Sequence, residues 1–319
     1  MSERDIGLEV LEGIREIKAY KDRVLLRDLF REQQAGLTVY SPDCTQSRLW
    51  GNLDHAIHEA TGFQIVRRQW INHDINTILR FYRGSEDQPP VEQDPIEAFH
   101  KYDSVPVELL QYGHLMVKLL LMGPSLVTIW RGNNVIPTLL SIKGKTQPAE
   151  AADGSIRGSF WCDNGVCNLA HTSDDAAEAE RELAALRLEQ WLDEAVGQAP
   201  LINPIPAPTA YVAHSGISIV GDVVNRLLIA ANAEPMSIHL PASGSAKETN
   251  QLLTGQLREA ADRYSEIAAF VDAFLAGDLI TVTEMLTALP VTRWEHFVIQ
   301  CGTVNRDQWN VMPGARVSQ

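Results

Sequence analysis

The spacing of apolar and polar positions divides the first part of the chain into helices and strands. Between residues 5 and 34, apolar residues recur at three- and four-residue steps between charges, which predicts an amphipathic helix that Gly36 ends. Residues 37–40 then predict a short strand, 46–61 a helix and 63–70 a second strand. A strand, a helix and a strand at this spacing indicate a βαβ or split βαβ unit.

The pattern continues beyond this unit. It predicts, in order, a helix over 75–82 capped by Asp74, a polar, Pro-rich surface insertion over 84–98, a helix over 107–122, a strand over 125–130 and a helix over 135–142. Residues 147–159 have no regular period and are rich in Ala, Gly and small polar residues. This composition is typical of a long ordered loop, and such loops often carry function.

Residues 155–174 hold the best candidate for chemistry. Asn168 and His171 frame one short predicted strand, and Asp174 is placed to cap a helix over 175–190. A histidine just before a helix N-terminus lies where main-chain amides attract anions, so His171 is a candidate nucleophile facing a phosphate. Taken alone, one histidine among nine is more often a satisfied structural residue, so the residues around it must decide.

Composition and charge narrow the class of protein. The 319 residues suffice for two domains, and a hydrophobic content of 45% allows a large core. The net charge of −14 argues against general nucleic-acid binding, which needs clustered Lys and Arg. No apolar run is long enough to span a membrane, and the charged first residues do not resemble a signal peptide.

The four cysteines give no sign of a disulfide framework or a metal site. Cys44, Cys162, Cys167 and Cys301 form no CxxC pair and lack partners at zinc-site spacing. We therefore expect reduced thiols, a cytoplasmic protein without a bound structural metal, and neither nucleic acid nor membrane as a partner.

Many positions between residues 123 and 182 have nearly fixed spacing, and together they resemble nucleoside diphosphate kinases. The shared positions are Gly123-Pro124, Trp130-x-Gly132-x-Asn134, Gly144-x-Thr146-x-Pro148-Ala149, Gly154-Ser-Ile-Arg157-Gly158, Asn168-x-x-His171-x-Ser173-Asp174 and Ala179-x-x-Glu182. Chance is a poor explanation for such a set. The resemblance implies an α+β fold with a ferredoxin-like βαββαβ order. It also implies nucleoside di- and triphosphates, carried with Mg²⁺, as ligands.

The resemblance also assigns roles to the site residues. It implies a ping-pong reaction in which His171 takes the γ-phosphoryl group of a nucleoside triphosphate and passes it on. Glu182 would hold the other ring nitrogen; without the resemblance it is an ordinary solvated acid. The remaining residues would bind the nucleotide: Arg157 and Thr146 at the phosphates, Asn168 at the sugar and phosphate, and Ser173 within the histidine motif. Tyr82 would lie near the histidine ring. Phe99 or Tyr102 takes that place if the insertion is aligned differently.

Two departures from the family pattern remove positive charge. The family motif Lys-Pro-Asp reads Ser41-Pro42-Asp43 here, and the family arginine six residues before the loop threonine is Leu140. Losing one preorganised donor typically costs ~3–4 kcal/mol, or about 10²–10³ in rate. A cation nearby in the sequence would compensate; the candidates are Lys143, one helical turn beyond Leu140, and also Lys145 and Arg48.

The sequence also predicts a second domain. A Pro-rich linker over 198–208 separates a kinase-like domain at 37–197, preceded by a helical extension over 1–36, from the remainder at 209–319. The remainder contains two segments that match earlier ones, at offsets that differ by about the length of the insertion. We therefore expect a degenerate second copy of the fold, without the histidine, docked as a partner subunit would be. The alternative is a generic α+β domain.

Three functions are compatible with these patterns. The first is a phosphotransferase acting through His171, with a specialised acceptor. The second is a catalytically weak or inactive relative that binds a nucleotide or a partner protein. The third keeps the nucleotide pocket for different chemistry on the phosphate. The sequence leaves the oligomeric state open, and a homo-oligomer is compatible with each of the three.

Overall fold

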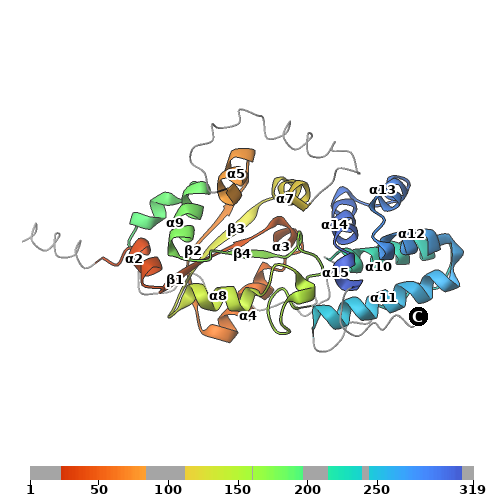
Figure 1. Ribbon diagram of the computed structural model, residues 1–319, viewed down its shortest axis with the longest axis horizontal. Helices are drawn as coiled ribbons and strands as arrows, with labels where there is room; N and C mark the ends of the chain where they lie inside the picture. Colours follow the sequence, from red (N-terminus) through yellow and green to blue (C-terminus); the bar gives the residue numbers. More distant parts are fainter. Residues whose placement is uncertain (1–22, 84–111, 160, 197–214, 239–243, 311–319) are drawn as a thin grey trace, which may run out of the picture.

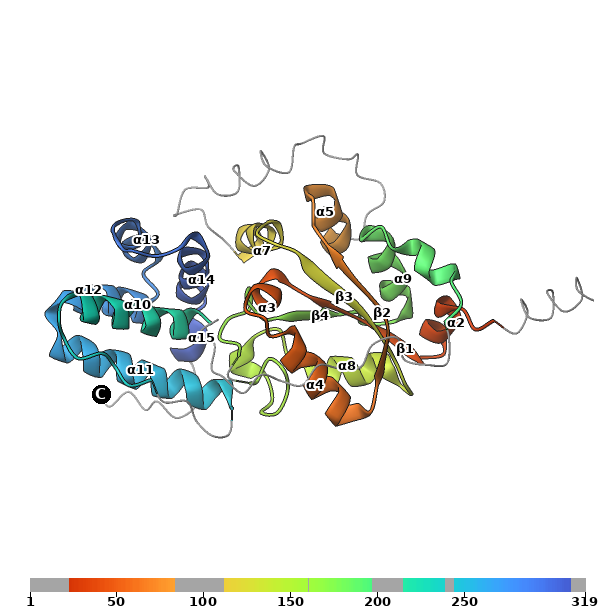
Figure 2. The same ribbon diagram turned by 180° about the vertical axis from the view of Figure 1, so that it is seen from behind.

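The computed structural model describes residues 23–83, 112–159, 161–196, 215–238 and 244–310 (Figure 1). Two parts lie side by side in both views. Residues 23–196 build an α+β part around one sheet, and residues 215–310 build a helical part (Figures 1 and 2). The predicted insertion at 84–98 and the predicted linker at 198–208 lie outside the described residues.

The sheet has four antiparallel strands in the order β2-β3-β1-β4. The strands are β1 (Ala35–Tyr40), β2 (Gln64–Ile71), β3 (Ser125–Arg131) and β4 (Ala170–Thr172). With helices between β1 and β2 and between β3 and β4, this is the order of a split βαβ fold. The predicted α+β class is therefore confirmed for the first part of the chain, and so are the strands expected over 37–40, 63–70 and 125–130.

Alternating side chains build a core on each face of the sheet. Leu126 and Trp130 of β3 pack with helices α4 (Trp50–Thr61) and α8 (Val135–Lys143). The intervening residues of β3 pack on the other face with α2 (Leu26–Arg31), α5 (Ile75–Arg83) and α9 (Ala176–Ala185). In both views α5, α9 and α7 (Tyr112–Leu121) lie on one side of the sheet and α4 and α8 on the other. Successive side chains of β3 thus point to opposite faces of the sheet, as expected of a strand.

Two predicted helices near the N-terminus have different bounds. A helix was expected over residues 5–34, and within the described part of this range the structure has α2. Gly36 lies within β1 and does not end a helix. A Cβ on Gly36 would lie 2.7 Å from Cγ1 of Val135, so close packing of α8 on β1 requires this glycine. The helix expected over 46–61 begins later, at Trp50 in α4, and a separate short helix, α3 (Pro42–Gln46), precedes it. They are separated at Arg48, which has a φ of 58°.

The helix that follows β4 begins one residue later than expected. Asp175, and not Asp174, is its N-cap, because the Asp175 carboxylate accepts the main-chain N–H of Glu178 at 2.8 Å. Helix α9 ends at Ala185, well before residue 190, and a 3₁₀ helix follows over Glu189–Asp193. The Asp174 side chain is exposed.

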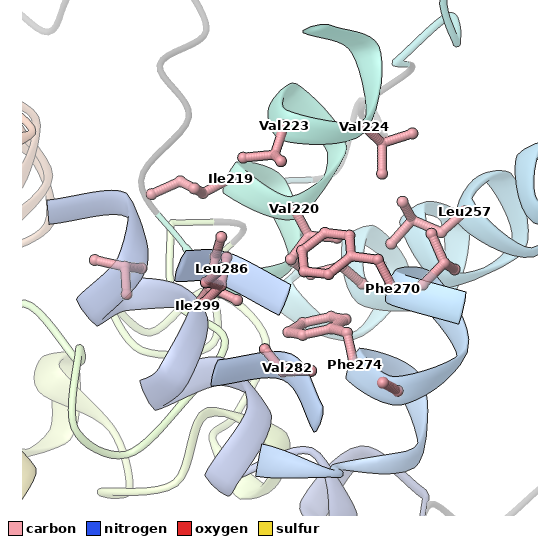
Figure 3. Close-up of a cluster of buried hydrophobic side chains, with 14 of the residues drawn as sticks. Ile219, Val220, Val223, Val224, Leu257, Phe270, Phe274, Val282, Leu286 and Ile299 are labelled. Atoms are coloured by element: carbon pink, nitrogen blue, oxygen red, sulfur yellow. The ribbon is translucent and has the colours of Figure 1, made fainter. Parts of the chain in front are cut away.

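The second part of the chain is helical and is not a second copy of the fold. Its helices are α10 (Gly216–Ala230), α11 (Ala246–Arg263), α12 (Ser265–Ala276), α13 (Leu279–Ala288), α14 (Arg293–Val304) and α15 (Asp307–Asn310). They enclose one apolar core in which side chains of several helices meet (Figure 3). Within residues 215–238 and 244–310 no strand of a sheet is present. The prediction of a tandem repeat was therefore wrong.

The error has a physical cause. The segments 219–224 and 279–282 are rich in Ile, Val and Thr, which favour strands when they are judged in isolation. Both segments lie in helices, because burial against several neighbours outweighs a propensity difference of well under 1 kcal/mol per residue. Helix α10 is buried at both Ile219 and Val220 and again at Val223 and Val224, so it has no clear polar face.

Helix α10 docks on the loop between Arg157 and Asn168. The Asp163 carboxylate accepts the main-chain N–H of Gly216 at 3.1 Å and of Ile217 at 2.7 Å, in the first turn of α10. The indole of Trp309 donates to the main-chain oxygen of Asp163 at 2.6 Å. The helical part therefore holds a loop of the α+β part at both the side chain and the main chain of one residue.

No helix in the described ranges combines the length and the apolar character that a membrane crossing requires. All four cysteines are free and buried.

Candidate active site

A cavity of about 240 Å³ lies at one edge of the sheet. Strands β1 and β2 end at this edge and β3 and β4 begin there, since Tyr40 is paired with both Leu126 and Ala170. The cavity is lined by Val39, Ser41, His73, Phe81, Tyr82, Met116, Leu120, Lys143, Thr146, Arg157, Asn168, Ala170, His171 and Asp174. Seven of the eight residues predicted for the site therefore either line this cavity or contact His171 directly, and the eighth, Ser173, contacts Glu182.

His171 is held by one ring nitrogen. Its Nε2 lies 2.7 Å from Oε1 of Glu182, so the carboxylate selects the tautomer with the proton on Nε2. The hydroxyl of Ser173 donates to the other oxygen of Glu182 at 2.5 Å, which fixes the carboxylate. Nδ1 of His171 makes no hydrogen bond within the described residues, and its lone pair is available to an electrophile.

The surroundings of His171 keep its ring in place and still reachable. The ring packs edge-on against Phe81, with centroids 5.0 Å apart. Its side chain is 31% exposed, whereas that of Glu182 is 4% exposed. An accessible imidazole oriented by a buried carboxylate is the arrangement of a nucleophile with a supporting group.

Arg157 and Asn168 form a hydrogen-bonded pair beneath the cavity. Nη2 of Arg157 donates to Oδ1 of Asn168 at 3.1 Å and to the main-chain oxygen of Ala170 at 2.6 Å. The Asn168 amide donates in turn to the main-chain oxygen of Gly165 at 2.8 Å. Both side chains are buried, and together they fix the start of β4, which carries His171.

The residue between Asn168 and Ala170 has an unusual main-chain conformation. Leu169 has a φ of 72°, a region that side chains other than glycine rarely adopt. Its N–H donates to Oδ2 of the buried Asp43 at 2.8 Å, and its oxygen accepts the N–H of Ser41 at 3.1 Å. Burial raises the pKa of Asp43. The Pro-Asp of the strand-end motif thus holds the turn that presents His171, and strain of this kind is common at functional sites.

The other predicted residues lie at the cavity in different ways. Thr146 is exposed on the wall, and its hydroxyl makes no hydrogen bond within the described chain. Tyr82 is 49% exposed and stacks edge-on with Phe81. Lys143 is half-buried and reaches the cavity from the end of α8. Leu140, in the place of the family arginine, is partly buried and packs against the apolar core beside the sheet.

Sequence reasoning missed His73, which lines the same cavity. Its Nε2 lies 2.9 Å from the hydroxyl of Ser125, and Nδ1 is buried without a partner. Burial lowers the pKa of His73 to about 4, so the ring is neutral at pH 7. The sequence feature that could have indicated His73 is its position shortly after β2. This strand ends at the same edge of the sheet as β1.

The cavity offers little to hold a metal ion by protein groups alone. Asp174 is its one carboxylate among the described lining residues, and no cluster of three metal-type ligands occurs in the described ranges. Mg²⁺ is commonly bound by one or two carboxylates together with substrate phosphates and waters. The donor set therefore fits a magnesium ion that arrives on a nucleotide.

Comparison with known proteins decides the family. A family model described as nucleoside diphosphate kinase matches residues 34–189. A nucleoside diphosphate kinase of Desulfitobacterium hafniense is 34% identical over 146 residues, which cover 46% of this chain and 82% of that protein. The chain belongs to the nucleoside diphosphate kinase family. The helical part lies outside the matched residues.

Other members of the nucleoside diphosphate kinase family match over different shares of their length. The enzyme of Brevibacillus brevis is 44% identical over 68 residues, 21% of this chain, and the chain spans 46% of its length. A crystal structure of the kinase from Pyrobaculum aerophilum superposes with a TM-score of 0.39 at 24% identity, covering 50% of this chain and 99% of that one.

Proposed function

We propose that this protein is a nucleotide phosphotransferase that forms a phosphohistidine at Nδ1 of His171. The arrangement of His171 and Glu182 carries this proposal, because it leaves one basic ring nitrogen free beside a cavity lined by Lys143, Arg157 and Thr146. Membership in the nucleoside diphosphate kinase family supports the same substrate class, nucleoside di- and triphosphates.

The proposed reaction follows from the hydrogen bonds. The lone pair of Nδ1 attacks the γ-phosphorus, a nitrogen–phosphorus bond forms, the bond to the β-phosphate oxygen breaks, and the nucleoside diphosphate leaves. The ring gains positive charge as the bond forms, and the carboxylate of Glu182 facing Nε2 stabilises that charge. No proton has to leave the ring. A terminal oxygen of an acceptor diphosphate then attacks the phosphorus, the nitrogen–phosphorus bond breaks, and Nδ1 regains its lone pair.

Other cavity groups would position the nucleotide. The exposed hydroxyl of Thr146 is available to a phosphate oxygen, and the apolar side of the cavity, at Met116 and Leu120, suits a nucleobase. Magnesium, bound to the phosphates, would neutralise part of their charge, and Asp174 is placed to contact it directly or through water.

A second candidate function is nucleotide binding without turnover. Two observations favour it: Ser41 stands where the family has lysine, and Leu140 stands where it has arginine and packs, partly buried, against the apolar core. Each missing donor is expected to slow phosphoryl transfer about 10²–10³-fold.

Labelling with γ-³²P-ATP separates the two functions. The full chain should acquire a label that is lost in acid and kept in base, and His171→Ala should abolish it. His55→Gln is the matched control, because His55 is a partly exposed histidine that does not line the cavity; it should label like the wild type. A wild-type protein that binds ADP and takes no label would establish the binding function instead.

A further inference from the structure

The cavity must neutralise phosphate charge without the family lysine and arginine. The Ser41 hydroxyl is occupied by a 2.5 Å hydrogen bond to Asp43, and Leu140 is a partly buried apolar residue that packs against the core. Three cations were candidates to compensate, and the structure separates them. Lys145 is 69% exposed and pairs with Glu150, Arg48 is exposed and does not line the cavity, and Lys143 does line it.

Lys143 has the geometry of a cation without a protein counter-ion. Its ammonium contacts the main-chain oxygen of Thr172 at 3.4 Å, next to His171 in β4. No Asp or Glu oxygen of the described residues lies within salt-bridge distance of it. An ammonium group has three hydrogens to donate, and one long contact leaves most of that capacity unused at the cavity.

We propose that Lys143 contacts the terminal phosphates of the bound nucleotide and so replaces, from the end of α8, the positive charge that is absent at the end of β1. This inference rests on the proposed function, because it names a further catalytic residue of the same site. The ammonium would donate hydrogen bonds to phosphate oxygens and stabilise the charge on the departing diphosphate. It neither gains nor loses a proton.

The charges around Lys143 support an anionic ligand. The guanidinium of Arg157 is close enough to act on it electrostatically, so two cations share one cavity wall. Burial first, and then Arg157, lower the pKa of Lys143 to about 8, while the carboxylates of Asp174 and Glu182 oppose the shift. A phosphate between the two cations would relieve their repulsion and keep the ammonium protonated.

The test measures ADP and GDP affinity by calorimetry at pH 7 and compares Lys143→Met with Lys145→Met. We expect Lys143→Met to weaken nucleoside diphosphate binding at least ~10-fold and to slow labelling about 10²–10³-fold. Lys145→Met, two residues away and exposed, should stay within about twofold of the wild type. Binding of adenosine, which carries no phosphate, should be the same in all three proteins.

Two further variants test whether the position of the charge matters. Ser41→Lys combined with Lys143→Met returns a cation to the end of β1 and should recover most of the lost affinity. Lys143→Arg should bind ADP at pH 7 and keep its affinity up to pH 9.5. The wild type should weaken across the same range, since the Lys143 ammonium deprotonates near pH 8 in the free protein.

Each remaining outcome decides between the claims. Unchanged ADP affinity and labelling in Lys143→Met would overturn the role of Lys143 and leave the phosphohistidine proposal standing. An equal loss of adenosine and ADP binding would show a general disruption of the cavity and would also overturn it. If the wild type binds ADP without taking a label, and Lys143→Met binds ADP more weakly than the wild type, the phosphate contact holds and turnover fails. No binding of ADP or GDP by the wild type would refute both.

Discussion

The α+β part and the helical part of this protein differ in how their residues act. In the α+β part a few polar side chains meet at one sheet edge, and their resemblance in type and spacing to nucleoside diphosphate kinases indicated the candidate site. The helical part has none of the cavity-lining residues, and it shares the larger apolar cluster with Leu115 and Leu119 of α7. Yet the loop between Arg157 and Asn168, which frames the site, is held by α10 and Trp309. The comparison indicates that the candidate site belongs to one part, while the other part helps to hold a loop beside it.

The largest expected effect lies within the α+β part. Glu182→Gln removes the negative charge that faces Nε2 of His171, so phosphohistidine formation should slow about 10²–10³-fold while ADP affinity changes little. Single-turnover labelling and calorimetry measure the two quantities. Glu189→Gln, at an exposed acid in the 3₁₀ helix that follows α9, is the control. If Glu182→Gln labels at the wild-type rate, the carboxylate does not support the nucleophile.

The boundary between the parts gives the next effect. Asp163→Ala leaves the buried N–H groups of Gly216 and Ile217 without their acceptor, which should lower the free energy of unfolding by about 2–4 kcal/mol. Below the unfolding transition, ADP affinity should also fall, because the loop next to Asn168 loses its support.

Helix α13 provides a matched control for Asp163. Asp278→Ala removes another aspartate cap, whose carboxylate accepts the N–H of Thr281 at 3.1 Å, away from the cavity. It should cost less stability than Asp163→Ala, because it removes a single exposed cap hydrogen bond, and it should leave ADP affinity unchanged. Equal ADP affinity in the Asp163 variant and the wild type would mean that the helical part does not position the site.

The smallest expected effect concerns stability and pH. The lowered pKa of Lys143 means that burying its charge destabilises the fold below pH 8. Between about pH 8 and the pKa of an unfolded lysine, ~10.4, the unfolded state binds more protons, so wild-type stability gains with rising pH. Lys143→Met should therefore melt a few degrees, roughly 2 °C, higher at pH 7, and this advantage should shrink towards pH 10. A constant or negative difference would contradict a buried charged lysine.

Sequence reasoning succeeded where local patterns dominate. Strand alternation at Leu126 and Trp130, the cap at Asp74 and the motif around His171 are short-range signals, and each corresponds to the element it predicted. The resemblance named Glu182, which without it would be an ordinary acid in a helix. It also left three candidate cations, and only folding separates Lys143 from Lys145 and Arg48.

The failures have long-range causes. Helix α10 forms from a β-branched run because neighbours about 30–80 residues away, such as Leu253 and Val298, bury it. His73 reaches the cavity because β2 and β1 end at one edge, and strand order is a property of the whole sheet. Asp163 joins the two parts through the amides of α10, which no spacing within the loop could indicate.

A crystal structure of the protein with ADP and Mg²⁺ tests the central claim most directly. The account predicts ADP in the cavity at the sheet edge, with its terminal phosphate facing Nδ1 of His171 and within hydrogen-bond distance of Lys143. ADP bound elsewhere, or bound with its phosphates turned away from His171, would contradict the account.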